Sequence, residues 1–463
     1  MPMPMTRREF LSASAAALLT LPSGGEAATI STANFRRGGS IHSMMNWGTL
    51  RDGDPQHYVP RPFETPRNDF PAAFTRDFAR SGFDFIRLTL DVGPFMQLQG
   101  ADRQALERKL IDNIGLFHDL GLAVIVDCHP VEQVPTYSPQ SILNDLEGPL
   151  FVEYTSMIGR LATLLADFPP GRVALELMNE PTMRDTSHRT QVKVWGAAQL
   201  VLHDAARRAA VDLPLLLTGA DYGGISGLRD LDPSPFIDSN TLFSFHYYMP
   251  LSFTHQGTDF GVPDAPASPY AVGLPYPYDA VPPKDIAAAI EERIAADTKL
   301  DAAGKDVARS DARRILAGFL SDAWNRARIE SDFARVGAWA DRNGIARHRI
   351  ILGEFAATRR VAGFTGADTP SRLRWLSDVT HLAQAGGMGD QRSRHGYRQG
   401  TRQRSNRPRY GRSRARRRAG DVRLEVSGSG YFSRSGRAFQ MLAEKWPLPI
   451  GPCIQIQRRT VFE

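Results

Sequence analysis

Cysteines are few in this sequence and long apolar runs are missing, and both features narrow what the protein can be. Only 2 cysteines, Cys128 and Cys453, occur among 463 residues, which excludes a disulfide framework and a four-cysteine zinc site. No stretch of 18 apolar residues follows the N-terminus, so we expect no stable membrane span. With 42% hydrophobic and 23% charged residues, the composition suits one large folded core rather than a disordered chain.

The positive charge is concentrated at the C-terminal end. Residues 390–463 hold 18 Lys plus Arg against 5 Asp plus Glu, a net of +13, which leaves −7 for residues 1–389 out of the overall +6. No helical or strand period runs through the arginine-rich part. We predict that residues 390–463 are a frame-shifted or disordered tail. The alternative is a genuine basic tail that binds nucleic acid or an anionic glycan.

The N-terminus carries an export pattern. Arg7 and Arg8 precede Phe10, and a short, alanine-rich, weakly apolar run follows. This resembles a twin-arginine signal with a cleavage site near Ala27. A membrane anchor would need a longer and more apolar run. We therefore predict that residues 1–27 are a signal peptide, that the Tat export machinery is a partner, and that the mature protein is periplasmic or secreted.

From about residue 40, short apolar runs alternate with amphipathic segments, such as Leu106–Phe117 and Ser371–Ala385. Strand–helix alternation predicts an α/β fold with a parallel sheet. Seven strands are predicted: Ser40–Met44, Phe83–Leu88, Ala123–Asp127, Val173–Met178, Leu215–Thr218, Thr241–Phe245 and Arg349–Gly353. We predict a (β/α)8 TIM barrel over residues 28–389, whose eighth strand, due just after Gly387, is missing or replaced by the tail.

About a hundred residues separate the sixth and seventh predicted strands, far more than a usual crossover. The segment 250–343 is therefore predicted to be an insertion. Loops that follow barrel strands lie at the catalytic face, so the insertion is expected to wall the cleft. The alternative is a surface decoration.

Polar residues stand at the predicted strand ends, where a barrel places its chemistry. Two carboxylates, Glu180 and Glu354, follow the fourth and seventh strands. Arginine, histidine, asparagine and tyrosine accompany them: Arg87, His129, Asn179, His246 and Tyr248. Paired carboxylates at one mouth suit glycoside hydrolysis, in which one protonates the leaving oxygen and the other attacks or stabilises the anomeric carbon. Asp127, Cys128 and His129 also allow a metal site, but no second ligand cluster supports one, so we expect no metal and no cofactor.

These residues resemble glycoside hydrolase family five, the cellulase and mannanase family. The matching pieces occur in the family's order: Phe85-Ile86-Arg87-Leu88, Val126-Asp127-Cys128-His129, Leu177-Met178-Asn179-Glu180-Pro181, Phe245-His246-Tyr247-Tyr248 and Leu352-Gly353-Glu354-Phe355. No single piece is specific, but five in order at predicted strand ends are. The family also has a tryptophan on an eighth strand, and this sequence shows no such strand after Gly389.

The resemblance implies a role for each residue. Glu354 would be the nucleophile, oriented by Arg87, and Glu180 the general acid and then the base. Asn179 would hydrogen-bond the sugar 2-hydroxyl, and His129 would hold other hydroxyls of the same sugar. His246 would support Glu180, and Tyr248 would donate to Glu354. Apart from the resemblance, Trp47 follows the first predicted strand, so it is expected either to stack on a sugar ring or simply to pack against the protein.

We therefore expect an exported retaining glycosidase that cleaves β-linked polysaccharide, foremost an endo-β-1,4-glucanase. A β-mannanase or another β-glucanase is the second reading. A glycan-binding protein that has lost activity with its eighth strand is the alternative of another class. For an exported glycosidase we expect no nucleic acid partner.

Overall fold

The computed structural model describes residues 34–69, 72–262, 264–360 and 365–388. The predicted signal peptide, the predicted tail and the position due for an eighth strand lie outside the described residues. Within the described part of the chain, no helix is both long enough and apolar enough to span a bilayer.

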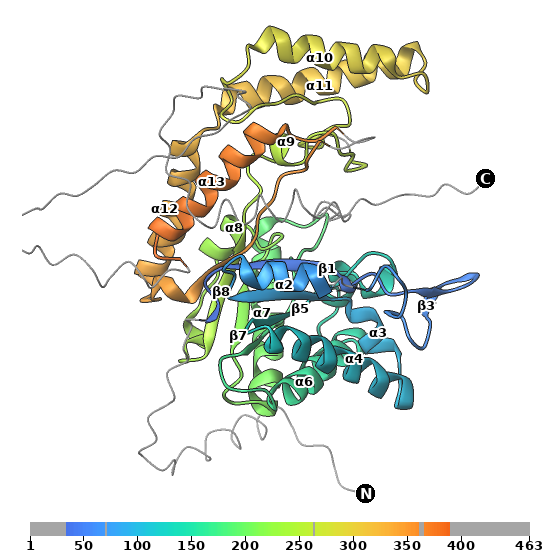
Figure 1. The fold of residues 1–463 in the computed structure, drawn as a ribbon, viewed down its shortest axis with the longest axis vertical. Helices are drawn as coiled ribbons and strands as arrows, with labels where there is room; N and C mark the ends of the chain where they lie inside the picture. Colours follow the sequence, from blue (N-terminus) through green and yellow to red (C-terminus); the bar gives the residue numbers. More distant parts are fainter. Residues whose placement is uncertain (1–33, 70–71, 263, 361–364, 389–463) are drawn as a thin grey trace, which may run out of the picture.

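A curled sheet of seven parallel strands forms the centre of the protein (Figure 1). Its order is β1-β4-β5-β6-β7-β8-β9, so each strand pairs with the next one of the sheet along the chain. The strands are β1 (Gly38–Met45), β4 (Phe85–Leu90), β5 (Ala123–Cys128), β6 (Val173–Glu176), β7 (Leu215–Thr218), β8 (Thr241–His246) and β9 (Ile350–Glu354). All seven predicted strands are confirmed, each within two residues of its predicted bounds. Of the predicted (β/α)8 barrel, the described residues thus form seven parallel strands in an open, curled sheet.

The inner face of the sheet has two layers, because side chains of one strand alternate between its faces. Buried apolar residues fill the lower layer: Phe35, Phe85, Ala123, Ile125, Ala174, Leu216, Leu242 and Ile351. Two residues further along each strand, the same face becomes polar: Arg87, Asp127, Glu176, Thr218 and Ser244, all buried. The apolar layer thus supports a polar floor that faces the carboxyl ends of the strands.

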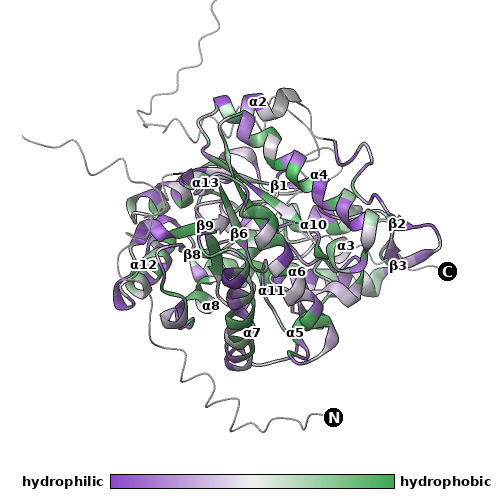
Figure 2. Ribbon diagram, turned by 90° about the horizontal axis from the view of Figure 1, so that it is seen from below, coloured by the Kyte–Doolittle hydropathy of each residue, from purple (hydrophilic) through white to green (hydrophobic). Residues whose placement is uncertain are grey.

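Helices cover the outer face of the sheet. They are α2 (Ala72–Arg80), α4 (Gly100–Asp119), α6 (Pro149–Leu165), α7 (His188–Ala209), α8 (Ile225–Arg229), α12 (Arg326–Arg342) and α13 (Thr369–Ala385). The predicted helical stripe of α4 is confirmed, since Leu106, Leu110, Ile114 and Phe117 are all buried. In Figure 2 the strands near the centre are largely green, and purple residues gather on the outward sides of the surrounding helices. This is the pattern expected when each helix buries one apolar stripe on the sheet.

Shorter elements lie in the loops at the carboxyl ends of the strands, next to the polar floor. After β1 comes a hairpin of β2 (Leu50–Arg51) and β3 (Asp54–Tyr58), and after β4 and β5 come α3 (Val92–Gln97) and α5 (Pro139–Leu143). In Figure 1 the hairpin projects beside β1.

The segment between β8 and β9 contains four helices. It begins with α9 (Leu251–Thr254) and continues through α10 (Pro283–Ala296) and α11 (Ala302–Asp322), which pack side by side beyond the end of the sheet (Figure 1). The last helix, α12, lies on the sheet: the Trp339 and Phe333 rings meet Phe243 and Phe245 of β8 edge-on. Residues 326–342 thus act as the crossover helix, and the extra structure lies before them.

The interior and the edges of the sheet differ in burial. Every residue of β4 to β8 is buried, whereas β1 and β9 contain partly exposed residues. Among the described strands, β1 pairs only with β4 and β9 only with β8. The curl is therefore left open between β1 and β9 by the part of the chain that the structure describes.

Candidate active site

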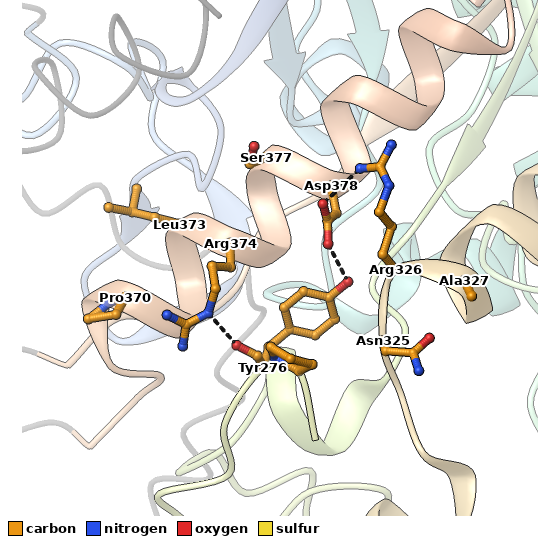
Figure 3. Close-up of a pocket in the computed structure, with 10 residues that line it drawn as sticks. Tyr276, Asn325, Arg326, Ala327, Pro370, Leu373, Arg374, Ser377 and Asp378 are labelled. Carbon is orange, nitrogen blue, oxygen red and sulfur yellow. Dashed lines mark hydrogen bonds and ion pairs between the residues drawn. The ribbon is translucent and has the colours of Figure 1, made fainter. Parts of the chain in front are cut away.

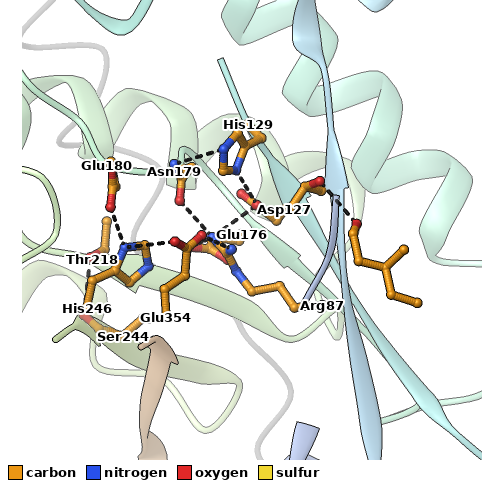
Figure 4. A network of polar contacts seen from close by, with 12 residues as sticks. Arg87, Asp127, His129, Glu176, Asn179, Glu180, Thr218, Ser244, His246 and Glu354 are labelled. Atoms are coloured by element: carbon orange, nitrogen blue, oxygen red, sulfur yellow. Dashed lines mark hydrogen bonds and ion pairs between the residues drawn. The ribbon is translucent and has the colours of Figure 1, made fainter. Parts of the chain in front are cut away.

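Arg87 lies at the centre of the polar floor and is 1% exposed. Its guanidinium bonds Glu176 twice, with Nε to Oε2 at 2.7 Å and Nη2 to Oε1 at 3.0 Å (Figure 4). It also pairs with Asp127 at 3.0 Å and with Glu354 through Nη1. Burial alone would lower the pKa of Arg87, but these three carboxylates raise it well above its ordinary value. The arginine is thus a fixed positive charge at the centre of the polar floor.

Glu354 reaches the inner face through a β-bulge. Strict alternation from the inward Ile351 would turn Glu354 outward, but the pairing of β8 with β9 slips at Gly353 so that His246 stands opposite Glu354. A Cβ on Gly353 would lie 2.4 Å from Ser244 Oγ and 3.1 Å from the His246 ring. Only glycine permits this close approach of the two strands.

Three groups surround the Glu354 carboxylate. Arg87 bonds its Oε1, the Tyr248 hydroxyl donates to Oε2 at 2.8 Å, and His246 Nδ1 lies 3.9 Å from Oε2. Burial alone would raise the pKa of Glu354, but the charges of His246 and Arg87, helped by His42 and His129, hold it well below its ordinary value. Glu354 is therefore an ionised, oriented carboxylate, as a nucleophile requires.

Glu180 lies in the loop that follows β6 and has a different environment. Its side chain is 28% exposed, and its φ of 43° is in the left-handed region that residues with a Cβ rarely adopt. His246 Nδ1 bonds Oε1 at 2.9 Å. Burial would lower the pKa of His246, but Glu354 and Glu180 raise it, so the imidazole favours its protonated form. Strain of this kind is common where a side chain is held for function.

The two carboxylates lie close together on either side of His246. One oxygen of Glu180, one of Glu354 and a His246 ring nitrogen all lie within 4.8 Å of one another. Figure 4 shows both carboxylates pointing toward the histidine, Glu354 from β9 and Glu180 from the loop that follows β6.

Asn179 and His129 complete the floor. Asn179 accepts from Arg87 Nη2 at 2.8 Å, and its Nδ2 lies 3.4 Å from His129 Nε2. His129 Nδ1 bonds Asp127 at 2.7 Å. Burial would lower the pKa of His129, and Asp127 raises it. The backbone of Asn179 is fixed as well, because its N–H donates to Cys128 O at 2.7 Å.

Trp47, the remaining predicted residue, stands apart from this network. It follows β1, its φ is 57°, and its carbonyl accepts from Arg67 Nη2 at 2.9 Å. The next residue, Gly48, donates its N–H to Asp91 Oδ2 at 2.9 Å. The loop that carries the tryptophan is therefore tied to the end of β4.

Sequence reasoning missed His42 on β1. Its ring meets the His129 ring edge-on at 5.5 Å, and burial, against the raising effect of Glu354, lowers its pKa to about 4. A signal was present: Ser40 pairs with Arg87, and His42 is two residues further on, on the same face. Asp127, considered above only as a metal ligand, and Glu176 both form ion pairs with Arg87.

On distance alone, two groups of three side chains could hold a metal ion: Asp127 with His129 and Glu354, and Glu180 with His246 and Glu354. The positive charge that such carboxylates need is already supplied by the Arg87 guanidinium and by His246. An added cation would compete with both.

A separate cavity of about 580 Å³ lies between α12, α13 and the 276–277 segment (Figure 3). Its charged groups are paired with one another: Asp378 accepts from Tyr276 and Arg326, each at 2.8 Å, and Arg374 donates to Tyr276 O at 2.8 Å. None of its lining residues belongs to the network around Glu354.

Comparisons with known proteins identify the family of the chain. The model of the family described as cellulase (glycosyl hydrolase family 5) matches residues 63–386, more than half of the chain. Endoglucanase 3 of Fibrobacter succinogenes is 25% identical over 215 residues, which cover 43% of this chain and 30% of that protein. The chain thus spans less than a third of the length of that curated relative.

Solved structures resemble the fold. Cel5A of Thermotoga maritima in complex with mannotriose has a TM-score of 0.53 at 17% identity, covering 78% of this chain and 90% of that one. A hyperthermophilic endo-β-1,4-glucanase in complex with substrate has a TM-score of 0.51 at 19% identity, covering 77% and 88%. At such identities the likeness supports the fold alone.

Proposed function

The chain belongs to glycosyl hydrolase family 5 and is a glycosidase, and from this premise we propose that it is an exported, retaining endo-β-1,4-glucanase. The observation that supports the retaining mechanism is the proximity of Glu180 and Glu354: one oxygen of each lies within 4.8 Å of the other, and His246 Nδ1 lies close to both carboxylates. Retaining enzymes hold their two carboxyl groups about 5–5.5 Å apart, whereas inverting enzymes leave about 6.5–9.5 Å for a water molecule.

In the first step, Glu354 attacks the anomeric carbon, and the bond to the leaving oxygen breaks. Arg87 and Tyr248 hold both oxygens of the nucleophile, which fixes its direction of attack. Glu180 donates its proton to the leaving oxygen. His246 engages Glu180 Oε1, so Oε2 remains to carry that proton.

In the second step, the roles of Glu180 reverse. It takes a proton from water, the water oxygen bonds to the anomeric carbon, and the bond to Glu354 breaks. Asn179 is oriented by Arg87 through its oxygen and faces His129 with one amide N–H, which leaves the other N–H to bind the sugar 2-hydroxyl, a contact that strengthens in the transition state.

The polymer is proposed from the relatives. One similar structure is titled an endo-β-1,4-glucanase and another holds mannotriose, so β-1,4-glucan is the first candidate and β-mannan the second. A glycan-binding protein without activity is the alternative of another class.

Release of reducing ends from carboxymethylcellulose, glucomannan and β-1,3-glucan separates these candidates. We expect release from carboxymethylcellulose, and Glu354→Gln should abolish it. Release from glucomannan alone would favour the mannanase. Binding to any of the three without release would contradict the enzyme assignment for the chain as written.

Export is proposed from Arg7 and Arg8 in the N-terminal pattern. Replacing both with lysine should leave the protein in the cytoplasm of a host with twin-arginine transport. Unchanged recovery from the periplasm would argue against this route.

A further inference from the structure

The segment that follows β8 packs behind the nucleophile's partner, Tyr248. Four residues of α9 and its neighbour His255 come directly after the turn at Pro250. The Thr254 hydroxyl lies 2.5 Å from Tyr248 O and 3.2 Å from Pro250 O. Thr254 is 1% exposed and His255 is 7% exposed, so this contact is buried.

Hydrogen-bond accounting fixes the state of the neighbouring imidazole. The Thr254 hydroxyl has one proton, which it gives to a carbonyl, either Tyr248 O or Pro250 O. It must therefore accept from His255 Nδ1, which lies 2.9 Å away. Burial lowers the pKa of His255 to about 4, so the ring is neutral, with its proton on Nδ1.

The His255 ring also touches the Tyr248 ring itself. The two meet edge-on with centroids 5.3 Å apart, and Phe260 covers His255 from another side at 5.4 Å. The imidazole thus limits how the phenol can tilt, while Thr254 fixes the backbone that carries it.

A second tether joins the same segment to the strand of the nucleophile. Thr358 lies four residues after Glu354. Its N–H donates to Thr254 O at 2.8 Å, and its hydroxyl lies 3.2 Å from Gln256 O. Contacts therefore run in a closed ring from Glu354 to Tyr248, through Thr254, and back to the loop that follows β9.

We propose that Thr254 and His255 are positioning residues, which hold the Tyr248 hydroxyl in its hydrogen bond to the Glu354 carboxylate. This inference rests on the proposed function of Glu354. The first turn of the long segment between β8 and β9 would then help to orient the nucleophile.

The test compares Tyr248→Phe, His255→Phe, Thr254→Val and the double variant Tyr248→Phe/His255→Phe. The substrate is 2,4-dinitrophenyl β-cellobioside, whose leaving group needs no proton, so the acid limb of kcat/KM reports on Glu354. Arg87, His246, His42 and His129 face Glu354 in every variant.

Tyr248→Phe should move the acid limb upward by about one pH unit, because a hydrogen bond to the charged carboxylate is lost. His255→Phe and Thr254→Val should move it in the same direction by less. The double variant should match Tyr248→Phe alone, since His255 acts through Tyr248.

His203→Phe is the matched control, because His203 is also 7% exposed and lies on α7, outside the network. Whatever its effect on stability, this variant must leave the acid limb of kcat/KM in place. An unmoved limb in His255→Phe and Thr254→Val, or additive shifts in the double variant, would overturn the proposal.

A readout without substrate separates this inference from the proposed function. The Glu354 carboxyl carbon, assigned by comparison with Glu354→Gln, is titrated by 13C NMR in the wild type and in His255→Phe. A wild type that releases no dinitrophenolate contradicts the function, whereas an equal Glu354 pKa in both proteins contradicts the role of His255.

Discussion

Glu354 and Glu180 lie at one mouth but have opposite surroundings. Glu354 has a 6% exposed side chain, with Arg87 on one oxygen and Tyr248 on the other. Glu180 has a 28% exposed side chain and one bond, to His246. The charges of His246 and Arg87 keep the Glu354 carboxylate ionised. This contrast supports the proposed roles, with Glu354 as the nucleophile and the more exposed Glu180 as the group that reaches the leaving oxygen.

The largest expected effect comes from removing the nucleophile. Glu354→Ala should lower kcat on glucan by at least about 10⁴-fold, because no covalent intermediate forms. Added azide should take the place of the carboxylate and give the α-glycosyl azide from an activated substrate.

Glu153→Gln serves as the control for Glu354→Ala, since Glu153 pairs with Arg160 on the surface of α6, and it should leave kcat unchanged. A β-glycosyl azide from Glu354→Ala would reverse the two assignments.

Glu180→Ala should cost about 10²–10⁴-fold on glucan, the range typical of one acid–base group. With 2,4-dinitrophenyl β-cellobioside the first step should be nearly normal, because that leaving group needs no proton. The intermediate should then accumulate, and azide should release it as the β-glycosyl azide.

An equal loss on both substrates would contradict this reading of Glu180. It would mean that the residue is needed for binding or for folding rather than for proton transfer.

Arg87→Met removes the guanidinium with which three buried carboxylates form ion pairs: Asp127, Glu176 and Glu354. The free energy of unfolding should fall by about 3–5 kcal/mol, as for a buried pair that loses one member. Urea denaturation measures the change.

Arg184→Met is the matched surface variant, because Arg184 pairs with Glu132 and its side chain is 49% exposed. Its cost should be at most about 1 kcal/mol. Similar losses in the two arginine variants would show that the floor around Arg87 is not a buried charge network.

The smallest expected effect is on the pH dependence of stability, where His255 and His246 act in opposite directions. His255, behind Tyr248, has a pKa of about 4, so the unfolded chain binds its proton more readily between pH 6.5 and 4. The contribution of neutral His255 to the free energy of unfolding is complete above pH 6.5, and about 3 kcal/mol of it is lost as the pH falls to 4. His246, beside Glu180, has a raised pKa. Its contribution is complete below pH 6.5 and is lost as the pH rises through that raised pKa.

His255→Phe should therefore lower the slope on the acid side by the share that His255 contributes and leave the alkaline side alone, while His42, whose pKa is also about 4, keeps its own share. Thermal unfolding from pH 4 to 9 provides the measurement. A slope between pH 6.5 and 4 that is the same in the wild type and in His255→Phe would show that His255 does not contribute to it.

The strands and most of the site residues could be predicted from the sequence, and the reason is physical. Short apolar runs are typical of a fully buried parallel strand, and Asn179 and Glu180 were predicted as polar residues that follow such a run, whereas Arg87 lies inside β4. Glu354 was placed correctly at a strand end, but alternation alone would turn it outward. The bulge at Gly353 depends on how closely β8 and β9 approach.

Other features depend on contacts between distant segments, which periodicity does not report. The left-handed backbone of Glu180 arises from the loop around it. His255 and Thr254 lie in a segment without helical or strand period, and only the fold brings them against Tyr248. His42 was within reach, because its parity with Ser40 places it on the face of Arg87.

In the proposed double displacement, Glu354 attacks the anomeric carbon and Glu180 transfers the protons. The most direct measurement is the anomeric configuration of the first product, followed by ¹H NMR on a soluble cello-oligosaccharide before mutarotation. Two successive inversions predict that the β-anomer appears first and the α-anomer grows in later. The α-anomer appearing first would mean a single displacement by water, and would contradict the roles assigned to both glutamates.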